Sequence, residues 1–182
     1  MILITYVAFL RGINVSGKRK VPMVELRAMC ERLNLQDVKT YIQSGNIVFK
    51  SSIVKAKDLA ILLHNEIKKH FGFDVPVIVK TVDGLSQIIE KNPFISQEDI
   101  AANKIYFVLL SSQPANELLE NLSEETFENE EYAVIDSCLY LKCALGYGRA
   151  KLNNNLIERK LKILATARNY RTMNKLLELC NQ

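Results

Sequence analysis

The sequence predicts an α+β protein. It is expected to open with a ferredoxin-like split βαβ module, β-α-β-β-α-β, and to continue into a related α/β half with C-terminal helices. The apolar run from Ile2 to Leu10 is typical of a buried strand. Two later segments repeat apolar residues at helical spacing, and short β-branched and aromatic runs lie between and after them. The 182 residues are 48% hydrophobic and 24% charged, which is ordinary globular usage and allows a core without disulfides.

The first half supplies all six elements of the module within about 80 residues. Right-handed crossovers would place both of its helices on one face of the sheet. In order, the expected elements are a strand over 2–10, a helix from Pro22, strands over 37–42 and 46–51, a helix over 59–71 and a strand over 75–81.

The second half begins in the same β-α-β-β order once an initial helix has passed, so we expect a structural duplication. Its elements are a helix over 83–91, a strand over 104–111, a helix over 114–122, a hairpin over 132–143 and helices over 154–161 and 170–180. No linker or low-complexity segment separates the halves. We therefore predict halves 1–82 and 83–182 packed as a single compact body.

Charge is distributed in blocks along the chain, although the net charge is only +4. Residues 1–82 hold 13 Lys/Arg and 6 Asp/Glu, residues 83–148 hold 3 and 12, and residues 149–182 hold 8 and 2. Such blocks are typical of solvated faces of unequal sign. They also permit an anion site where the two basic blocks meet.

Several classes of site have no support in the sequence. No apolar run approaches the roughly 20 residues of a membrane span, and no signal-peptide pattern is present, so we predict a cytoplasmic protein. No CxxC, HExxH or GxSxG motif occurs, which predicts no metal site and no cofactor. The four cysteines, Cys30, Cys138, Cys143 and Cys180, are expected to be buried reduced thiols. The two histidines, His64 and His70, lie six residues apart on different faces of one helix, so they do not form a paired metal site.

The loop after the first strand carries the strongest chemical signal. Gly12 to Lys18 fits GxxxxGK, and it follows a strand and precedes a helix, as a phosphate loop does. However, Arg19 stands where a Walker A motif needs Ser or Thr, and the helix begins only at Pro22. A nucleotide triphosphatase is therefore not favoured. Glycine-freed backbone amides and the basic residues Lys18 to Lys20 still predict anion binding, with a merely solvated basic loop as the alternative.

Three further segments could contribute to a site. If Thr166 or Asn169 caps the last helix, Arg168 and Arg171 lie near its positive end, where an internal acid or an anionic ligand would stabilise them. The loop from Gly146 to Lys151, which contains Arg149, is similar in type. The Gln43-Ser44-Gly45-Asn46 turn offers uncharged hydrogen-bonding groups, although turn chemistry alone also explains it.

Three stretches give the chain a family resemblance. They are YVAFLRGINVSGKRKVPMVELR (Tyr6 to Arg27), VKTYIQSGNIVF (Val38 to Phe49) and ATARNYRTMNKL (Ala165 to Leu176), and they resemble the bacterial domain-of-unknown-function family 1697. Ser16 and Tyr170 depart from that family's pattern, which has glycine and tryptophan there. The resemblance implies an α+β fold built on ferredoxin-like modules and implies no activity. It also groups the RGIN loop, the QSGN turn and the ARNYRT segment as parts of one site.

The leading hypothesis is a protein that binds a small ligand carrying phosphate or carboxylate at these loops. One alternative is a nucleic-acid-associated binding module, and another is that the basic clusters are purely structural. No membrane partner is expected, and whether the protein is an enzyme is open. The candidate ligand-binding residues are Arg11, Gly12, Asn14, Gly17, Lys18, Gln43, Ser44, Asn46, Arg149, Arg168, Asn169 and Arg171.

Overall fold

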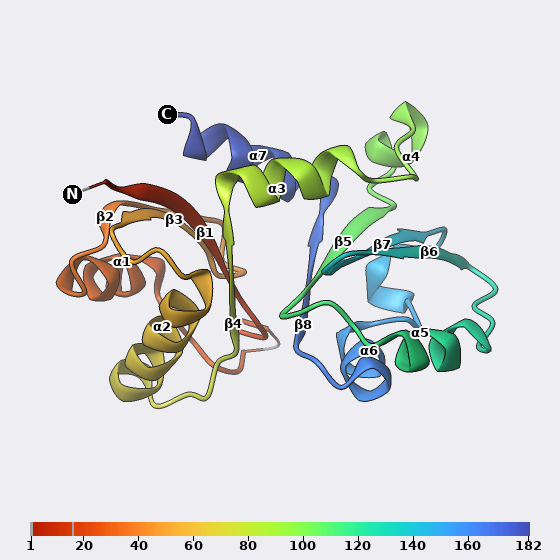
Figure 1. Cartoon of the computed structure of the whole chain (residues 1–182), viewed down its shortest axis with the longest axis horizontal. Coiled ribbons are helices and arrows are strands. Elements are labelled where there is room, and N and C mark those ends of the chain that lie inside the picture. The colour runs from red at the N-terminus through yellow and green to blue at the C-terminus, as the bar shows by residue number, and fades with distance from the viewer. Residues whose placement is uncertain (1, 16) are drawn as a thin grey trace. The chain divides into compact units, whose positions relative to one another are not determined.

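The computed structural model of the chain describes residues 2–15 and 17–182, and it confirms a mixed α+β fold with two four-stranded antiparallel sheets (Figure 1). Two compact units divide the chain. Unit 1 is Met1–Gln87 with Lys175–Gln182, and unit 2 is Ile88–Asn174. The packing of the halves into a single body stays a prediction. Among the helices of the described residues, none is long and apolar enough to cross a membrane.

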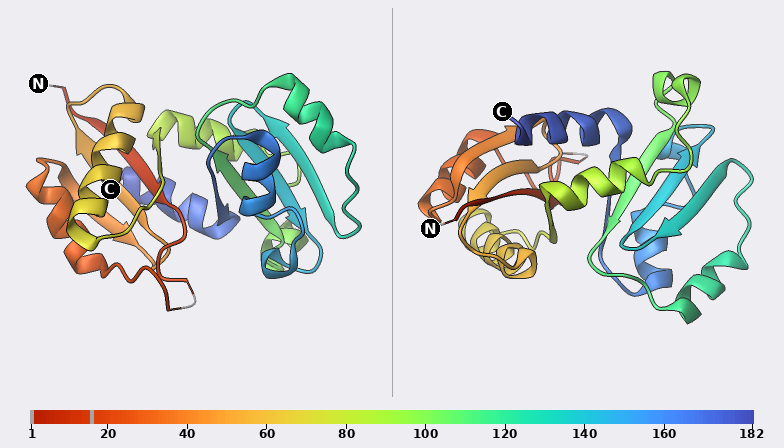
Figure 2. Two further views of the ribbon diagram at one scale, coloured as in Figure 1. Left: turned by 90° about the horizontal axis from the view of Figure 1, so that it is seen from below. Right: turned by 45° about the horizontal axis from the view of Figure 1, so that its top comes forward.

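Unit 1 is built on one sheet with strand order β2-β3-β1-β4. Both α1 and α2 cover the same face of this sheet, as the crossover rule predicts (Figures 1 and 2). The elements are β1 (Ile4–Leu10), α1 (Met23–Arg32), β2 (Gln36–Tyr41), β3 (Asn46–Ser51), α2 (Ala56–Phe71) and β4 (Val77–Thr81). These bounds agree with the expected elements to within a few residues.

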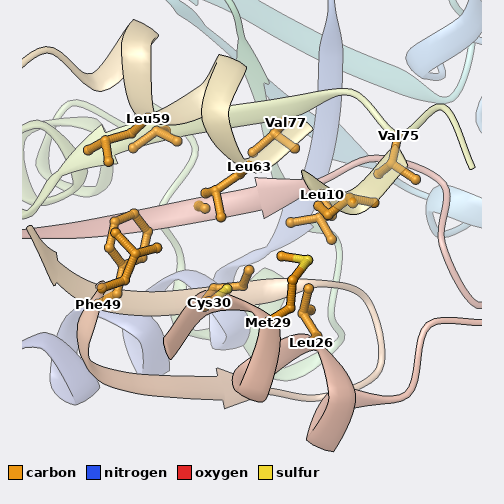
Figure 3. Close-up of a cluster of buried hydrophobic side chains, with 14 of the residues drawn as sticks. Leu10, Leu26, Met29, Cys30, Phe49, Leu59, Leu63, Val75 and Val77 are labelled. Atoms are coloured by element: carbon orange, nitrogen blue, oxygen red, sulfur yellow. The ribbon is translucent and has the colours of Figure 1, made fainter. Parts of the chain in front are cut away.

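The core of unit 1 lies between the sheet and its two helices. Leu26, Met29 and Cys30 project from α1, and Leu59 and Leu63 project from α2, toward apolar side chains of the strands (Figure 3). The helical spacing read from the sequence is the cause, because residues three and four apart share a helix face. The opposite face of the sheet contacts the end of α7 (Tyr170–Cys180), where the Lys39 Nζ donates to the Leu179 carbonyl at 3.3 Å.

Unit 2 repeats the β-α-β-β-α-β order, and its sheet has the equivalent strand order β6-β7-β5-β8. The helices α5 and α6 cover one face of it (Figures 1 and 2). Its elements are β5 (Ile105–Leu110), α5 (Asn116–Ser123), β6 (Glu130–Ile135), β7 (Cys138–Cys143), the 3₁₀ turn η1 (Tyr147–Arg149), α6 (Asn154–Leu161) and β8 (Ala165–Asn169).

The second face of the unit 2 sheet is covered by helix residues of the same unit. The phenolic hydroxyl of Tyr140 donates to the Ile88 carbonyl at 2.9 Å, at the end of α3 (Val82–Glu90). The rings of Phe107 and Tyr170 stack with centroids 6.2 Å apart, at the start of α7. Strand β5 is therefore buried on both faces, which explains its unbroken apolar sequence.

Two elements differ from the sequence-based expectation. The short helix α4 (Gln97–Ala101) was not predicted, although Ser96 caps it by accepting a hydrogen bond from the Asp99 amide at 3.1 Å. Strand β8 was also not predicted, because Ala165–Asn169 was treated as the approach to the last helix. Its five residues are two alanines and three polar residues, so local propensity is weak, and pairing with β5 decides the conformation.

Candidate functional site

The RGIN loop, which we define as residues 11–20, and the QSGN turn (Gln43–Asn46) meet at one end of the unit 1 sheet. The Asn14 side chain joins them. Its Nδ2 donates to the carbonyls of Val21 at 3.0 Å and Gln43 at 2.9 Å, and its Oδ1 accepts from the Val21 amide at 2.9 Å. Asn14 has a φ of 53°, a left-handed conformation that asparagine tolerates better than most residues. Asn14 therefore organises this loop corner.

A close approach at Gly45 holds the same corner together. Its carbonyl accepts a hydrogen bond from the Leu10 amide at 2.8 Å, and its φ is +75°. A Cβ added there would lie 2.6 Å from the Leu10 Cβ and 2.8 Å from the Ile13 Cδ1. Only glycine fits this position, for conformational and for steric reasons.

The backbone amides of the RGIN loop are not arranged as a phosphate loop. The Asn14 amide donates to the Arg19 carbonyl at 3.1 Å, and the Lys18 amide donates to the Val15 carbonyl at 3.0 Å. These bonds fold the segment into a small hairpin instead of opening its amides toward one point. Gly12 and Gly17 have φ values of 70° and 73° and allow the bends. Ser16, the departure from the family pattern, lies outside the described residues.

The cationic side chains of the RGIN loop give its surface a positive charge. Lys18, Arg19 and Lys20 are exposed, and Arg11 is half-buried. Among the described residues, neither Lys18 nor Lys20 forms an ion pair. Arg19 is near Asp74, whose pKa is held below its usual range by a hydrogen bond from Lys68 and by the charges of Lys68, His64 and Arg19. Positive charge thus concentrates on this loop with little carboxylate to neutralise it.

The polar groups of the QSGN turn serve the turn itself. Asn46 is fully buried, and its Nδ2 donates to the Tyr41 carbonyl and to the Ser44 Oγ, both at 2.9 Å. The Gln43 carbonyl is the acceptor for Asn14, and its side chain is exposed. Of the three neutral side chains expected to meet a ligand, Asn46 is therefore withdrawn into the fold.

Arg168 lies on strand β8, two residues before α7 begins, and is only 7% exposed. Its Nη1 donates to the Thr166 Oγ1 at 2.9 Å and to the Ala167 carbonyl at 2.8 Å. Burial lowers the pKa of its guanidinium to about 10, while the neighbouring Tyr147 acts in the opposite direction. The sequence predicts Arg168 near the start of the last helix, and the structure places it there, on strand β8 and with its side chain buried.

Asn169 and Arg171 also have roles within unit 2. The Asn169 Oδ1 accepts from the Thr172 amide at 2.8 Å, which caps α7, so the expected cap is confirmed at Asn169. The Arg171 Nη2 donates to the Ala101 carbonyl at 3.1 Å, at the end of α4. Both groups satisfy helix ends that would otherwise lack partners.

The third basic loop, from Gly146 to Lys151, is bonded to a carboxylate of the protein itself. The Glu130 carboxylate accepts from the Lys151 and Leu152 amides, each at 2.8 Å. Arg149 is exposed in η1, and Gly146 has a φ of +78°. The sequence predicts this loop as a further part of a ligand site; in the structure the Lys151 and Leu152 amides bond to a carboxylate of the protein itself.

Metal and nucleophile chemistry find no support among the described residues. No cluster of three or more His, Cys, Asp or Glu suited to a metal ion occurs in that part of the chain. Burial raises the pKa of the Cys30 and Cys143 thiols to about 12 and that of Cys180 to about 11, which keeps them protonated at neutral pH. His64 Nδ1 contacts the Val75 carbonyl at 2.9 Å within unit 1.

The sequence and the fold are both similar to those of known proteins. A family model described as "Protein of unknown function (DUF1697)" matches residues 3–140, so the chain belongs to that family. The conserved bacterial protein SP0830 from Streptococcus pneumoniae is similar in structure, with a TM-score of 0.76 and 24% sequence identity over 98% of this chain and 99% of that one. At that identity the similarity establishes the fold alone. No curated protein matches the sequence.

Proposed function

We propose that the protein binds a small anionic ligand, carrying phosphate or carboxylate, at the loop corner formed by the RGIN loop and the QSGN turn. One observation carries the proposal. In unit 1 the connection from β1 to α1 has 12 residues, whereas the equivalent connection from β5 to α5 in unit 2 has 5. The topology needs only the shorter link. The additional residues of unit 1 bring the exposed cations, and long loops on a rigid scaffold commonly carry function.

Each part of the corner has a distinct role in this proposal. Lys18 and Lys20 attract and neutralise the anion, with Arg11 and Arg19 beside them. Asn14 and Gly45 do not contact the ligand but hold the loop in one conformation. A fixed loop loses less entropy when a ligand binds, which raises affinity without any added contact.

The charge of unit 1 supports an anionic partner. Unit 1 contains 14 Lys/Arg and 8 Asp/Glu, whereas unit 2 contains 10 and 12. Two of the three cationic residues of unit 2 that were candidates for the same site have internal partners: Arg168 bonds to Thr166, and Arg171 bonds to Ala101. We therefore restrict the proposed site to unit 1, with Arg149, Arg168, Asn169 and Arg171 outside it.

A thermal-shift titration tests this proposal. The probes are inorganic phosphate, citrate and a sugar phosphate, with wild type beside the double variant Lys18→Ala/Lys20→Ala. The control is Lys55→Ala/Lys57→Ala, which removes two exposed lysines at the start of α2 in the same unit. A probe at one hundred times its dissociation constant stabilises the protein by about 2.7 kcal/mol. We expect that shift in wild type and in the control, and its loss in the loop variant.

Two results would direct the function elsewhere. If no probe shifts the melting temperature of wild type, the basic loop is structural or solvated. If a short single-stranded RNA binds instead, with affinity that falls steeply as salt rises, the protein is a nucleic-acid-associated module. The Lys18→Ala/Lys20→Ala variant distinguishes binding at the loop from RNA binding over the whole basic face, because only the second would persist in this variant.

Two finer features belong to the same proposal. Both units share the order β-α-β-β-α-β, and their strand orders β2-β3-β1-β4 and β6-β7-β5-β8 are equivalent, which supports ferredoxin-like modules in each. The four cysteines are free thiols. Reduced thiols are typical of a reducing compartment, which supports a cytoplasmic location.

A further inference from the structure

A pocket lies in unit 1 beside the edge strand β2, and none of its lining residues was a candidate ligand-binding residue. Its volume is about 440 Å³, within the range of pockets that hold small molecules. It is formed by β1, the last turn of α1, the edge strand with its neighbour β3, and the end of α7. Its polar lining includes Thr5, Glu31, Asp37, Lys39 and Lys50, and Val48 is among its apolar residues.

An irregularity in β2 shapes this pocket. The pairing of β2 with β3 shifts register between Gln36 and Lys39, and Asp37 has a φ of 50°. A bulge of this kind bends an edge strand and redirects its side chains. Asp37 is thereby brought to Lys50, and its carboxylate accepts from the Lys50 Nζ at 2.6 Å. The hydrogen bond to Lys50 is the main reason that the pKa of Asp37 is lowered.

The pocket combines charges of both signs with an apolar wall. Lys39 and Lys50 supply two ammonium groups, and Glu31 and Asp37 supply two carboxylates. Each ammonium has three N–H groups, and the contacts described above use one on each: Lys39 to the Leu179 carbonyl, and Lys50 to Asp37. N–H groups therefore remain available on both.

Neighbouring groups add to this polar lining. Thr5 pairs directly with Lys50 across β1 and β3, so its side chain lies on the same face of the sheet. Among the described residues, the Glu31 carboxylate forms no ion pair or hydrogen bond. Val48, which is 3% exposed, and Leu179 supply the apolar wall.

We propose that this pocket binds a small zwitterion of dipeptide size that carries one carboxylate and one ammonium group. The ligand carboxylate would lie against Lys39, Lys50 and Thr5, and its ammonium group against Glu31 and Asp37. A simple anion would meet two opposing carboxylates here, and an apolar ligand would remove Lys39 and Glu31 from water without giving either an opposite charge. The site is separate from the loop corner, so the two proposals stand or fall independently.

The test uses amide chemical shifts of the full chain during titration with alanyl-leucine. Two blocked probes accompany it, the N-acetyl form without the ammonium group and the C-terminal amide without the carboxylate. We expect shifts confined to the pocket strands, and binding about tenfold weaker or more for either blocked probe, because each loses a charged hydrogen-bonding group. Lys50→Met and Glu31→Gln should weaken binding similarly, whereas Lys57→Met, which lies on α2, should not.

The blocked probes keep the test decisive even if a variant folds poorly, since they are applied to the wild-type protein. Equal binding of the blocked and unblocked probes would overturn the zwitterion assignment. Absence of shifts in residues 37–39 and 48–50 at saturating probe would overturn the site itself. Shifts at the RGIN loop alone would assign the dipeptide carboxylate to the loop corner and reject this pocket.

Discussion

The two units share one sheet topology but differ in the loops that connect its elements. In unit 1 the Leu10 amide donates to the Gly45 carbonyl at 2.8 Å, and in unit 2 the Leu110 amide donates to the Ser137 carbonyl at 3.0 Å. These bonds link the end of the first strand to the hairpin turn in each half. The sheet framework is therefore repeated down to individual hydrogen bonds.

A second pair of equivalent hydrogen bonds links the residue after each first strand to the segment that precedes the last strand of its sheet. The Arg11 amide donates to the Pro76 carbonyl, and the Ser111 amide donates to the Leu164 carbonyl, both at 3.0 Å. Immediately after this point the halves diverge, because the link to the next helix has 12 residues in unit 1 and 5 in unit 2. The additional linking residues of unit 1 are therefore not required by the fold, and the topology does not explain why so many of them are cationic.

The halves also differ in how a basic loop is neutralised. In unit 2 the Glu130 carboxylate occupies two amides of the loop at Lys151 and Leu152. In unit 1 the Asn14 and Lys18 amides of the RGIN loop donate to carbonyls of the same loop, and the side chains of Lys18 and Lys20 are exposed. One loop is closed by the protein itself, whereas the other leaves its charge available to a partner.

The largest expected effect is at the turn that anchors the unit 1 loop. Gly45→Ala should lower the free energy of unfolding by about 3 kcal/mol, because it combines a left-handed conformation with overpacking against Leu10 and Ile13. Urea denaturation measures the change. Gly72→Ala is the control, since its φ is also +75° but no atom lies within 4 Å of the added Cβ. That control should cost about 1 kcal/mol. Equal losses for both variants would contradict the close approach at Gly45.

The next effect concerns the side chain that joins the two loops. Asn14→Ala should destabilise unit 1 by about 2 kcal/mol, because it removes three hydrogen bonds to Val21 and Gln43. Asn34→Ala is matched to it, since Asn34 also has a positive φ of 60° and is exposed. Hydrogen exchange of the amides in residues 11–21 gives the local reading. If both variants lose the same stability, the conformation of Asn14 matters and its hydrogen bonds do not.

A smaller effect on the free energy of unfolding is expected at the contact between Glu130 and the basic loop of unit 2. Glu130→Gln should cost about 1 kcal/mol, because amides bond more strongly to a carboxylate than to a neutral amide oxygen. Glu128→Gln, an exposed neighbour, should change the unfolding free energy by far less. A calorimetric comparison of the two variants decides between them. No difference would show that the contact contributes by shape and not by charge.

The smallest effect is the acid response of unit 2. The pKa of Asp99 lies below its usual range because it accepts a hydrogen bond from Ser96 and interacts with Lys142 and Lys104. A lowered folded pKa gives stability that is complete above the unfolded value of about 3.9 and is lost as pH falls through the folded value. Asp99→Asn should therefore flatten the stability profile below about pH 4. Superimposable acid profiles for wild type and variant would refute this.

The sequence predicted the framework because the framework is periodic. Apolar residues at helical spacing identified α1, α2 and α7, and the strands of unit 1 followed from their composition and turns. The repeated β-α-β-β order was also visible, although β8 was not, since a five-residue strand with weak propensity forms only when a neighbour pairs with it. Without β8, Arg168 could only be placed near a helix end.

The candidate site was predicted as a set of residue types and not as an arrangement. Glycine, asparagine and basic residues distinguished the RGIN loop from the rest of the sequence. Whether Asn14 faces a ligand or its own backbone depends on the Val21 and Gln43 carbonyls, which lie seven and 29 residues away along the chain. No local pattern contains that information.

The sequence by itself thus determined the α+β class, the family, and the segments in which charge and glycine concentrate. The class and the segments follow from local composition and spacing, which act within a few residues, whereas the family follows from the resemblance of three long stretches. Tertiary structure alone decided which polar groups are consumed and which remain exposed, because a hydrogen bond is settled by the partner that folding brings to it. That is why Asn46 and Arg168 became parts of the interior, while Lys18 and Lys20 remained at the surface.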